Sequence, residues 1–117
     1  MKQEHKDLLL KDLCARLQYG VRAEIINRED IRRQVVVSYG NICYVPEIGN
    51  GWWKECKPYL FPMSSMTEEQ KTSHNFLKHS AYANSVILID FYIKNHFDYR
   101  GLIPKGLAID ATGKNIY

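Results

Sequence analysis

Residues 96–100 bring together the side chains of this sequence that are best suited to chemistry. Asp98 and Arg100 offer a carboxylate and a guanidinium on either side of the Tyr99 ring. Such a set suits the charged group of a protein partner, or a nucleotide. A structural role is the alternative: His96 would end the preceding helix, where a cation meets the helix dipole, and Asp98 with Arg100 would hold the loop.

Two adjacent tryptophans, Trp52 and Trp53, follow a glycine-rich turn at residues 49–51. Paired rings on a loop can form a stacking platform or a hot spot for a protein partner. The alternative is that one ring fills the edge of the core, because rings of this size often supply core area in small domains. The binding surface predicted from these segments comprises Trp52, Trp53, Tyr59, Asp98, Tyr99 and Arg100.

No pattern of catalytic or metal-binding residues stands out. Cys43, Cys56, His74 and His79 lack the closely spaced ligand pairs of structural zinc sites. The sequence has no Gly-x-Ser-x-Gly elbow, Walker loop or Gly-x-Gly-x-x-Gly motif. We therefore predict no catalytic residue, no metal and no cofactor, and an enzyme is the less favoured class.

Composition predicts a folded protein of the cytoplasmic type. The chain has 117 residues, of which 45% are hydrophobic, and a net charge of +3 that is spread along its length. The polar N-terminus is unlike a signal peptide, and the apolar run at 86–89 is too short to span a bilayer. Three cysteines form no disulfide framework, which favours a reducing compartment. Charge gives no special support to nucleic-acid binding.

The elements that must position these residues begin with a helix over residues 3–18. Its predicted apolar face is Leu10, Leu13, Cys14 and Leu17, which places Cys14 in the core and leaves Lys11, Asp12 and Arg16 elsewhere on the helix. Gly20 predicts its end. Alternation of apolar and polar residues then predicts antiparallel strands at 21–26, 34–39 and 42–45, with a short edge strand at 57–61.

Two more helices are predicted in the second half. Two overlapping capping-box patterns, Ser65 with Glu68 and Thr67 with Gln70, predict the start of a surface helix with a thin apolar face. A helix over 85–95 would bury Val86, Ile89, Ile93 and Phe97; a buried strand at 86–89 is the alternative. Turns are expected at 104–106 and 112–113. The predicted fold is one α+β domain over 1–117: an N-terminal helix, a small antiparallel sheet of three or four strands, and two C-terminal helices.

Three segments resemble a family of small uncharacterised proteins from gut anaerobes, their mobile elements and phages. They are residues 12–17 with 19–21, KPYLFPMSSMTEE at 57–69, and HFDYRGLIP at 96–104. The resemblance implies an accessory protein of a phage or mobile element and brings no activity with it. Phe61 stands where members of the family usually have a basic residue, so no anion-binding role is carried to that position.

The function favoured by the sequence is a non-enzymatic module that binds a protein of the host or of the element. The alternative is a small-ligand or nucleotide-binding protein that uses the same aromatic and arginine side chains. A third hypothesis, binding of RNA or single-stranded DNA, requires those rings to align with Arg22, Arg32 and Arg33. No contact with a membrane is expected.

Overall fold

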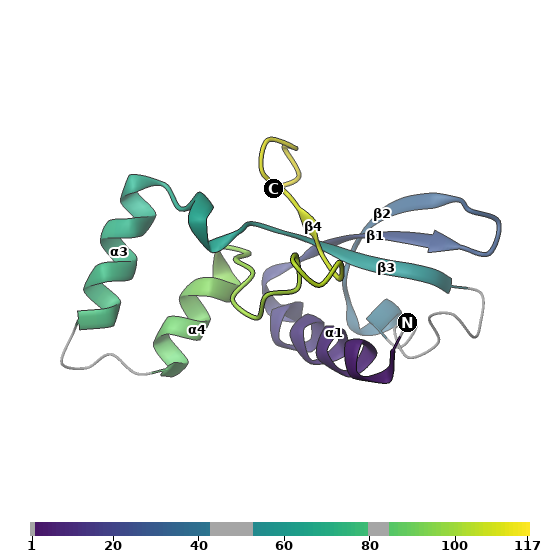
Figure 1. Ribbon diagram of the computed structural model, residues 1–117, viewed down its shortest axis with the longest axis horizontal. Coiled ribbons are helices and arrows are strands. Elements are labelled where there is room, and N and C mark those ends of the chain that lie inside the picture. The colour runs from purple at the N-terminus through teal and green to yellow at the C-terminus, as the bar shows by residue number, and fades with distance from the viewer. Residues whose placement is uncertain (1, 43–52, 80–84) are drawn as a thin grey trace.

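The computed structural model describes residues 2–42, 53–79 and 85–117, and it confirms the predicted α+β class (Figure 1). A long helix lies against a four-stranded sheet, and two later helices project from one end. The projection stretches the molecule to 50 × 27 × 24 Å, with a radius of gyration of 15.0 Å, against about 13 Å for a domain of roughly this length. The main elements in chain order are α1 (Gln3–Arg16), β1 (Arg22–Asn27), β2 (Arg32–Val36), α2 (Tyr39–Ile42), β3 (Trp53–Leu60), α3 (Glu68–His79), α4 (Ser85–Lys94) and β4 (Ile109–Asp110).

The sheet is mixed, so the prediction of a purely antiparallel sheet was wrong. Its strand order is β2-β1-β3-β4. β1 pairs antiparallel with both β2 and β3, whereas β4 pairs parallel with β3, at Tyr59 opposite Ile109 and Leu60 opposite Asp110. The C-terminal segment returns beside β3 in the same direction as that strand, which a prediction from local pattern cannot foresee.

Strand positions differ from the prediction in three places. The second strand ends at Val36, and Tyr39 and Ile42 belong to the short helix α2. The strand predicted at 42–45 therefore fails at Ile42, and its remaining residues lie outside the described part of the chain. The expected edge strand at 57–61 is instead the central strand β3. Pro58 lies opposite Ala23 on β1, and the pairing with β4 begins only after it, at Tyr59.

Helix α1 packs on one face of the sheet, but with a face rotated from the predicted one. Leu9 and Leu13 are fully buried against Ala23 and Leu60. Cys14, predicted in the core, is exposed. The buried stripe of α1 runs through positions three and four apart that include polar residues, so apolar periodicity alone misplaced it. The buried residues of α1 are Lys6, Leu9, Asp12, Leu13 and Arg16.

The helix ends and turns predicted from local sequence signals agree with the structure. α1 continues through a 3₁₀ turn to Gly20, whose φ of 66° is the left-handed conformation that favours glycine at a helix end. The capping box is formed in full: the Thr67 N–H donates to Gln70 Oε1 (2.9 Å), and the Gln70 N–H donates to Thr67 Oγ1 (3.1 Å). Gly106 and Gly113 lie in the two turns expected near the C-terminus.

Helices α3 and α4 lie side by side and are called the helical hairpin below; α1, the sheet and residues 96–117 are called the body (Figure 1). Residues 85–94 are helical, so the strand alternative at 86–89 was wrong. Only half of the predicted inner stripe is covered: Ile93 and Phe97 are buried, whereas Val86 and Ile89 are exposed. α4 meets the body with its last turn and extends past it. No described helix is long and apolar enough to cross a membrane.

Candidate functional site

The residues predicted to bind a partner lie in separate parts of the structure. Trp52 and the side chain of Trp53 lie outside the described residues; the Trp53 backbone pairs with Asn27 at the start of β3. Tyr59 is buried on the sheet, with its hydroxyl 3.4 Å from Glu24 Oε2. Asp98, Tyr99 and Arg100 gather on the other side, around the C-terminal end of α1. The described residues of the predicted surface therefore form no single open patch.

A fully buried ion pair, Asp12 with Arg16, lies at the centre of that second group. Arg16 Nε donates to Asp12 Oδ2 (2.8 Å), and both side chains are 0% exposed. Arg16 Nη2 also donates to the carbonyl oxygen of Phe97 (2.6 Å), just beyond α4. Arg16 thus fastens the segment that follows α4 to α1. Removing one partner of such a pair leaves an uncompensated buried charge, which is strongly destabilising.

Asp98 is committed to the backbone. Its two carboxylate oxygens accept hydrogen bonds from the N–H groups of Leu102 (2.7 Å) and Ile103 (2.8 Å). These bonds close the turn that leads from α4 back to the sheet. The arrangement agrees with the structural alternative, in which Asp98 holds the loop, and leaves little of its carboxylate for a ligand.

Tyr99 and Arg100 complete the buried cluster. The guanidinium carbons of Arg16 and Arg100 lie 5.4 and 5.0 Å from the centre of the Tyr99 ring, within cation–π range. Arg100 Nε is 3.9 Å from Asp12 Oδ1, and the Arg100 side chain is 19% exposed. Arg16 Nη1, Arg100 Nη1, Tyr99 Oη and His96 Nδ1 are buried without a hydrogen-bond partner among the described residues.

His96 borders this cluster and stacks on Tyr117, with the ring centres 3.7 Å apart and the planes 10° from parallel. Burial, with a smaller contribution from the charge of Arg16, lowers the pKa of His96 to about 4. The imidazole is therefore neutral at pH 7. The Tyr117 hydroxyl donates to the Tyr59 carbonyl oxygen (2.8 Å) and accepts from the Arg22 N–H (2.8 Å), which binds the C-terminal residue to the sheet.

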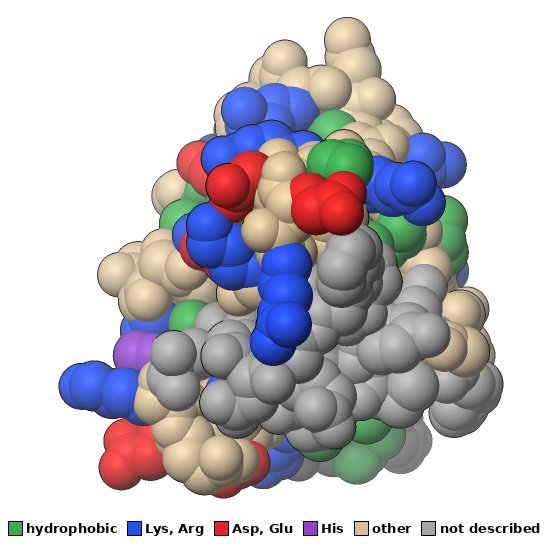
Figure 2. All heavy atoms as spheres, turned by 90° about the vertical axis from the view of Figure 1, so that its right-hand side faces the viewer, with side chains coloured by type: hydrophobic (Ala, Val, Ile, Leu, Met, Phe, Trp, Pro, Cys, Tyr) green, Lys and Arg blue, Asp and Glu red, His purple; other side chains and the backbone are tan. Residues whose placement is uncertain are grey.

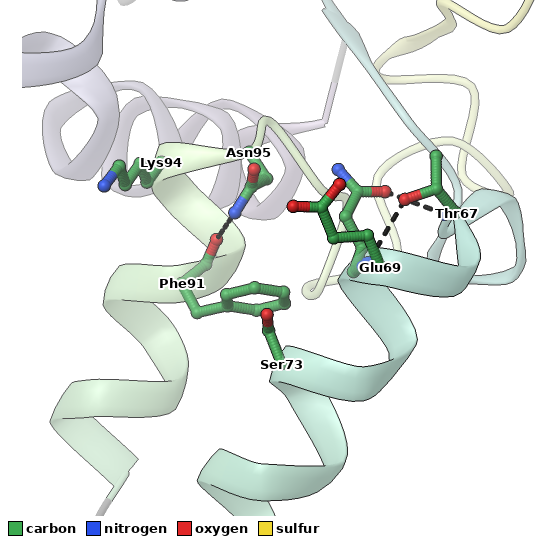
Figure 3. Close-up of a pocket in the computed structure, with 7 residues that line it drawn as sticks. Thr67, Glu69, Ser73, Phe91, Lys94 and Asn95 are labelled. Carbon is green, nitrogen blue, oxygen red and sulfur yellow. Dashed lines mark hydrogen bonds between the residues drawn. The ribbon is translucent and has the colours of Figure 1, made fainter.

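A cleft opens between the two helices of the helical hairpin, near its attachment to the body (Figure 3). Its volume is about 460 Å³, within the range of about 300–1,000 Å³ that small-molecule sites occupy. A smaller hollow of about 160 Å³, lined in part by Phe61 and Phe97, shares Thr67 and Gln70 with it. The cleft is lined by Thr67, Glu69, Gln70, Ser73, Phe91, Lys94 and Asn95.

The cleft was not predicted from the sequence, although the spacing of its lining residues gives a signal. Glu69 and Ser73 are spaced four apart on α3, and Phe91 and Asn95 are spaced four apart at the end of α4. Residues at that spacing share one helix face. Two such pairs on consecutive helices indicate side chains that face one another once the helices pack side by side.

Large apolar side chains are exposed on the last turns of α3 and the first turns of α4. Phe76 is 72% exposed and Val86 73%. Ile87 and Ile89 are 38% and 36% exposed. Val86 and Ile89 are spaced three apart and share one face of α4, and we call these two residues the distal apolar surface. Single exposed apolar residues are common on proteins, but several in one projecting element are typical of an interaction site.

The opposite end of the molecule, around the β1–β2 turn, carries charges of both signs (Figure 2). Arg32 pairs with Glu24 (2.8 Å), and Lys54 pairs with Asp30 (2.5 Å). Basic side chains on this end are thus partly neutralised by acidic neighbours. The arrangement differs from the single-sign basic surface that tracks a nucleic-acid backbone.

The two described thiols, Cys14 and Cys56, lie in different environments. Cys14 is exposed, and burial raises the pKa of Cys56 to about 12, which disfavours its thiolate. Among residues 2–42, 53–79 and 85–117, no three His, Cys, Asp or Glu side chains are grouped closely enough to hold a metal ion.

Comparison with protein-family models, with curated proteins and with solved structures gave no match to this chain.

Proposed function

We propose that this protein is a non-enzymatic interaction module whose helical hairpin docks on another protein. The observation that carries the proposal is the distal apolar surface. Val86 is 73% exposed and Ile89 is 36% exposed, on one face of a helix that projects from the body. Contact with a partner would remove this apolar area from water, which is the main favourable term in protein association.

The partner that fits best is an amphipathic helix with acidic residues beside its apolar stripe. Grooves and faces of α-helices commonly receive such helices through apolar anchors spaced three and four apart. The ionisable side chains in the last turn of α3 are basic, Lys78 and His79. The nearest acid on α4, Asp90, already accepts a hydrogen bond from the Tyr19 hydroxyl (2.7 Å). Acidic residues on the partner would complement this rim and speed association.

The resemblance to small proteins of mobile elements and phages supports a partner encoded by the host or by the same element. The aromatic residues at 52 and 53 remain candidates for a second contact, since their side chains lie outside the described residues. Buried Asp98 holds the turn at Leu102 and Ile103, and largely buried Arg100 lies against Asp12 of α1; we assign neither residue a direct contact with the partner.

Affinity purification from the native host tests the proposal. The tagged wild-type chain should retain a protein that the Val86→Asp variant loses, with affinity of the purified pair reduced by about 2 kcal/mol or more, the usual hot-spot threshold. The matched control is Ile31→Asp, which makes the same kind of change at a side chain 45% exposed on the β1–β2 turn. A partner that binds both variants equally well, or no protein retained by the wild type alone, would contradict the proposal.

A second candidate function, binding of a small ligand, is favoured by the cleft between α3 and α4.

A further inference from the structure

The floor of the cleft is an aromatic ring held in a fixed position. Phe91 reaches from α4 toward α3 and lies between the two helices (Figure 3). The His74 ring lies nearly parallel to it, at 9° and 5.9 Å between centres. His74 is itself held by contact of its Nε2 with the Tyr92 hydroxyl (2.8 Å). A ring braced in this way is a platform on which a planar ligand can stack without ordering the protein first.

Hydrogen-bond acceptors surround the Phe91 ring. The Glu69 side chain extends from α3 toward Asn95 on α4, above the ring (Figure 3). Glu69 forms no ion pair with any residue that the structure describes. The Asn95 Nδ2 group donates to the Phe91 carbonyl oxygen (2.9 Å), so the Asn95 Oδ1 atom lies on the far side of its amide group from that carbonyl. Ser73 adds a hydroxyl that can donate or accept.

This set of groups selects a planar ring that donates through two neighbouring N–H groups. The cleft volume of about 460 Å³ is far larger than an ammonium group requires, and it has room for a nucleoside. Among the bases, guanine presents N1–H and N2–H side by side, which matches the two oxygens of a carboxylate. Adenine presents a donor beside an acceptor, and its ring nitrogen N1 would meet the charge of Glu69 unfavourably.

We propose that the cleft binds a guanine base, stacked on Phe91, with N1–H and N2–H donating to the Glu69 carboxylate. The base belongs either to a free guanine nucleotide or to an unpaired guanosine in RNA, and the chemistry of recognition is the same for both. This site is independent of the distal apolar surface, which lies toward the other end of α4.

Titration of the full-length chain with guanosine, inosine and adenosine 5′-monophosphates tests the inference, with amide chemical shifts as the readout. Guanosine monophosphate should give saturable shifts at the residues around Glu69, Ser73, Phe91 and Asn95. Inosine monophosphate keeps N1–H but lacks the N2 amino group. It should therefore bind about tenfold more weakly, since one hydrogen bond to a charged group is worth roughly 1.5–3 kcal/mol.

Matched variants separate this site from a nonspecific one. Glu69→Gln should lower the affinity for guanosine monophosphate by about tenfold or more. The variant should then bind guanosine monophosphate no more tightly than adenosine monophosphate. Glu68→Gln is the control, because Glu68 adjoins it in sequence but pairs with Lys71 (3.2 Å) and does not line the cleft. Phe91→Leu should lower the affinity for all three nucleotides, because it removes the ring on which each base stacks. Thermal melts establish that each variant is folded.

The outcomes are distinct. A single-stranded hexaribonucleotide with one guanine that binds at least tenfold more tightly than the monophosphate identifies RNA as the source of the base, and equal affinity identifies the free nucleotide. No saturable shift with guanosine monophosphate, or equal losses in Glu68→Gln and Glu69→Gln, overturns the inference. Val86→Asp should leave nucleotide binding unchanged, so failure here is separable from failure of the proposed protein interaction.

Discussion

The body and the helical hairpin differ in how completely they bury their side chains. In the body, α1 buries apolar residues such as Leu13 completely, and also buries the charges of Asp12 and Arg16. In the helical hairpin, none of the twelve residues of α3 is buried, and Phe76 and Val86 face solvent. This difference indicates that most of the free energy of folding comes from the body. The helical hairpin contacts the body at one end only, and its other surfaces remain exposed.

The sharpest test of this division is to break the buried ion pair. Arg16→Ala leaves the Asp12 carboxylate buried without its main partner and should lower the free energy of unfolding by about 3–5 kcal/mol. The exposed pair of the helical hairpin is the control: Lys71→Ala removes the partner of Glu68 and should cost about 0.5 kcal/mol or less. Urea denaturation measures both. Similar losses in the two variants would contradict the assignment of stability to the body.

Core packing gives the next largest contrast. Leu13→Ala should cost about 2–5 kcal/mol, because it removes fully buried methyl groups and leaves a cavity between α1 and the sheet. Phe76→Ala deletes a larger side chain that is mostly exposed, and Cys14→Ala deletes an exposed thiol; each should change stability by about 0.5 kcal/mol at most. A cost for Phe76→Ala close to that of Leu13→Ala would show that α3 is packed, not open.

The capping box predicts a smaller effect that is confined to the helical hairpin. Thr67→Ala removes the acceptor for the Gln70 N–H and should destabilise the start of α3 by about 1 kcal/mol. Hydrogen exchange should speed up at the amides of α3 and remain unchanged in α1 and β1, because the two regions share few packed side chains. Equal acceleration in the body would mean that the molecule unfolds as one cooperative unit.

A pH dependence also separates the two regions. The pKa of His96 falls from 6.5 to about 4 on folding, so the unfolded chain binds more protons between these values. The contribution of His96 is therefore fully present above pH 6.5 and is lost as the pH falls toward 4. His96→Asn removes this titration and keeps a residue that tolerates the φ of 61° at this position.

His74 on the helical hairpin provides the comparison for that titration. Burial, with the charge of Lys78, also lowers the pKa of His74, but its surroundings are more open. Denaturation curves at pH 7 and pH 4.5 should show that His96→Asn reduces the pH dependence more than His74→Asn does. A larger loss of pH dependence in His74→Asn than in His96→Asn would contradict the conclusion that the more deeply buried histidine lies in the body.

The sequence by itself determined the features that depend on neighbours in the chain. The helix end at Gly20, the capping box at Thr67 and the helical state of residues 85–94 were predicted correctly, because backbone conformation and hydrogen bonds within a turn decide them. The α+β class followed from the change of period between Arg16 and Val21.

Only the tertiary structure decided which surfaces are covered. Asp12 and Arg16 looked like solvent-facing residues in the sequence, yet Phe97, 81 positions after Arg16, supplies the carbonyl that makes burial of Arg16 tolerable. Val86 and Ile89 continue the stripe of Ile93 without a reduction in hydrophobicity, but the body ends before it reaches them. The cleft likewise exists only because α3 and α4 lie side by side. Burial depends on partners distant in sequence, and no local pattern encodes where those partners stop.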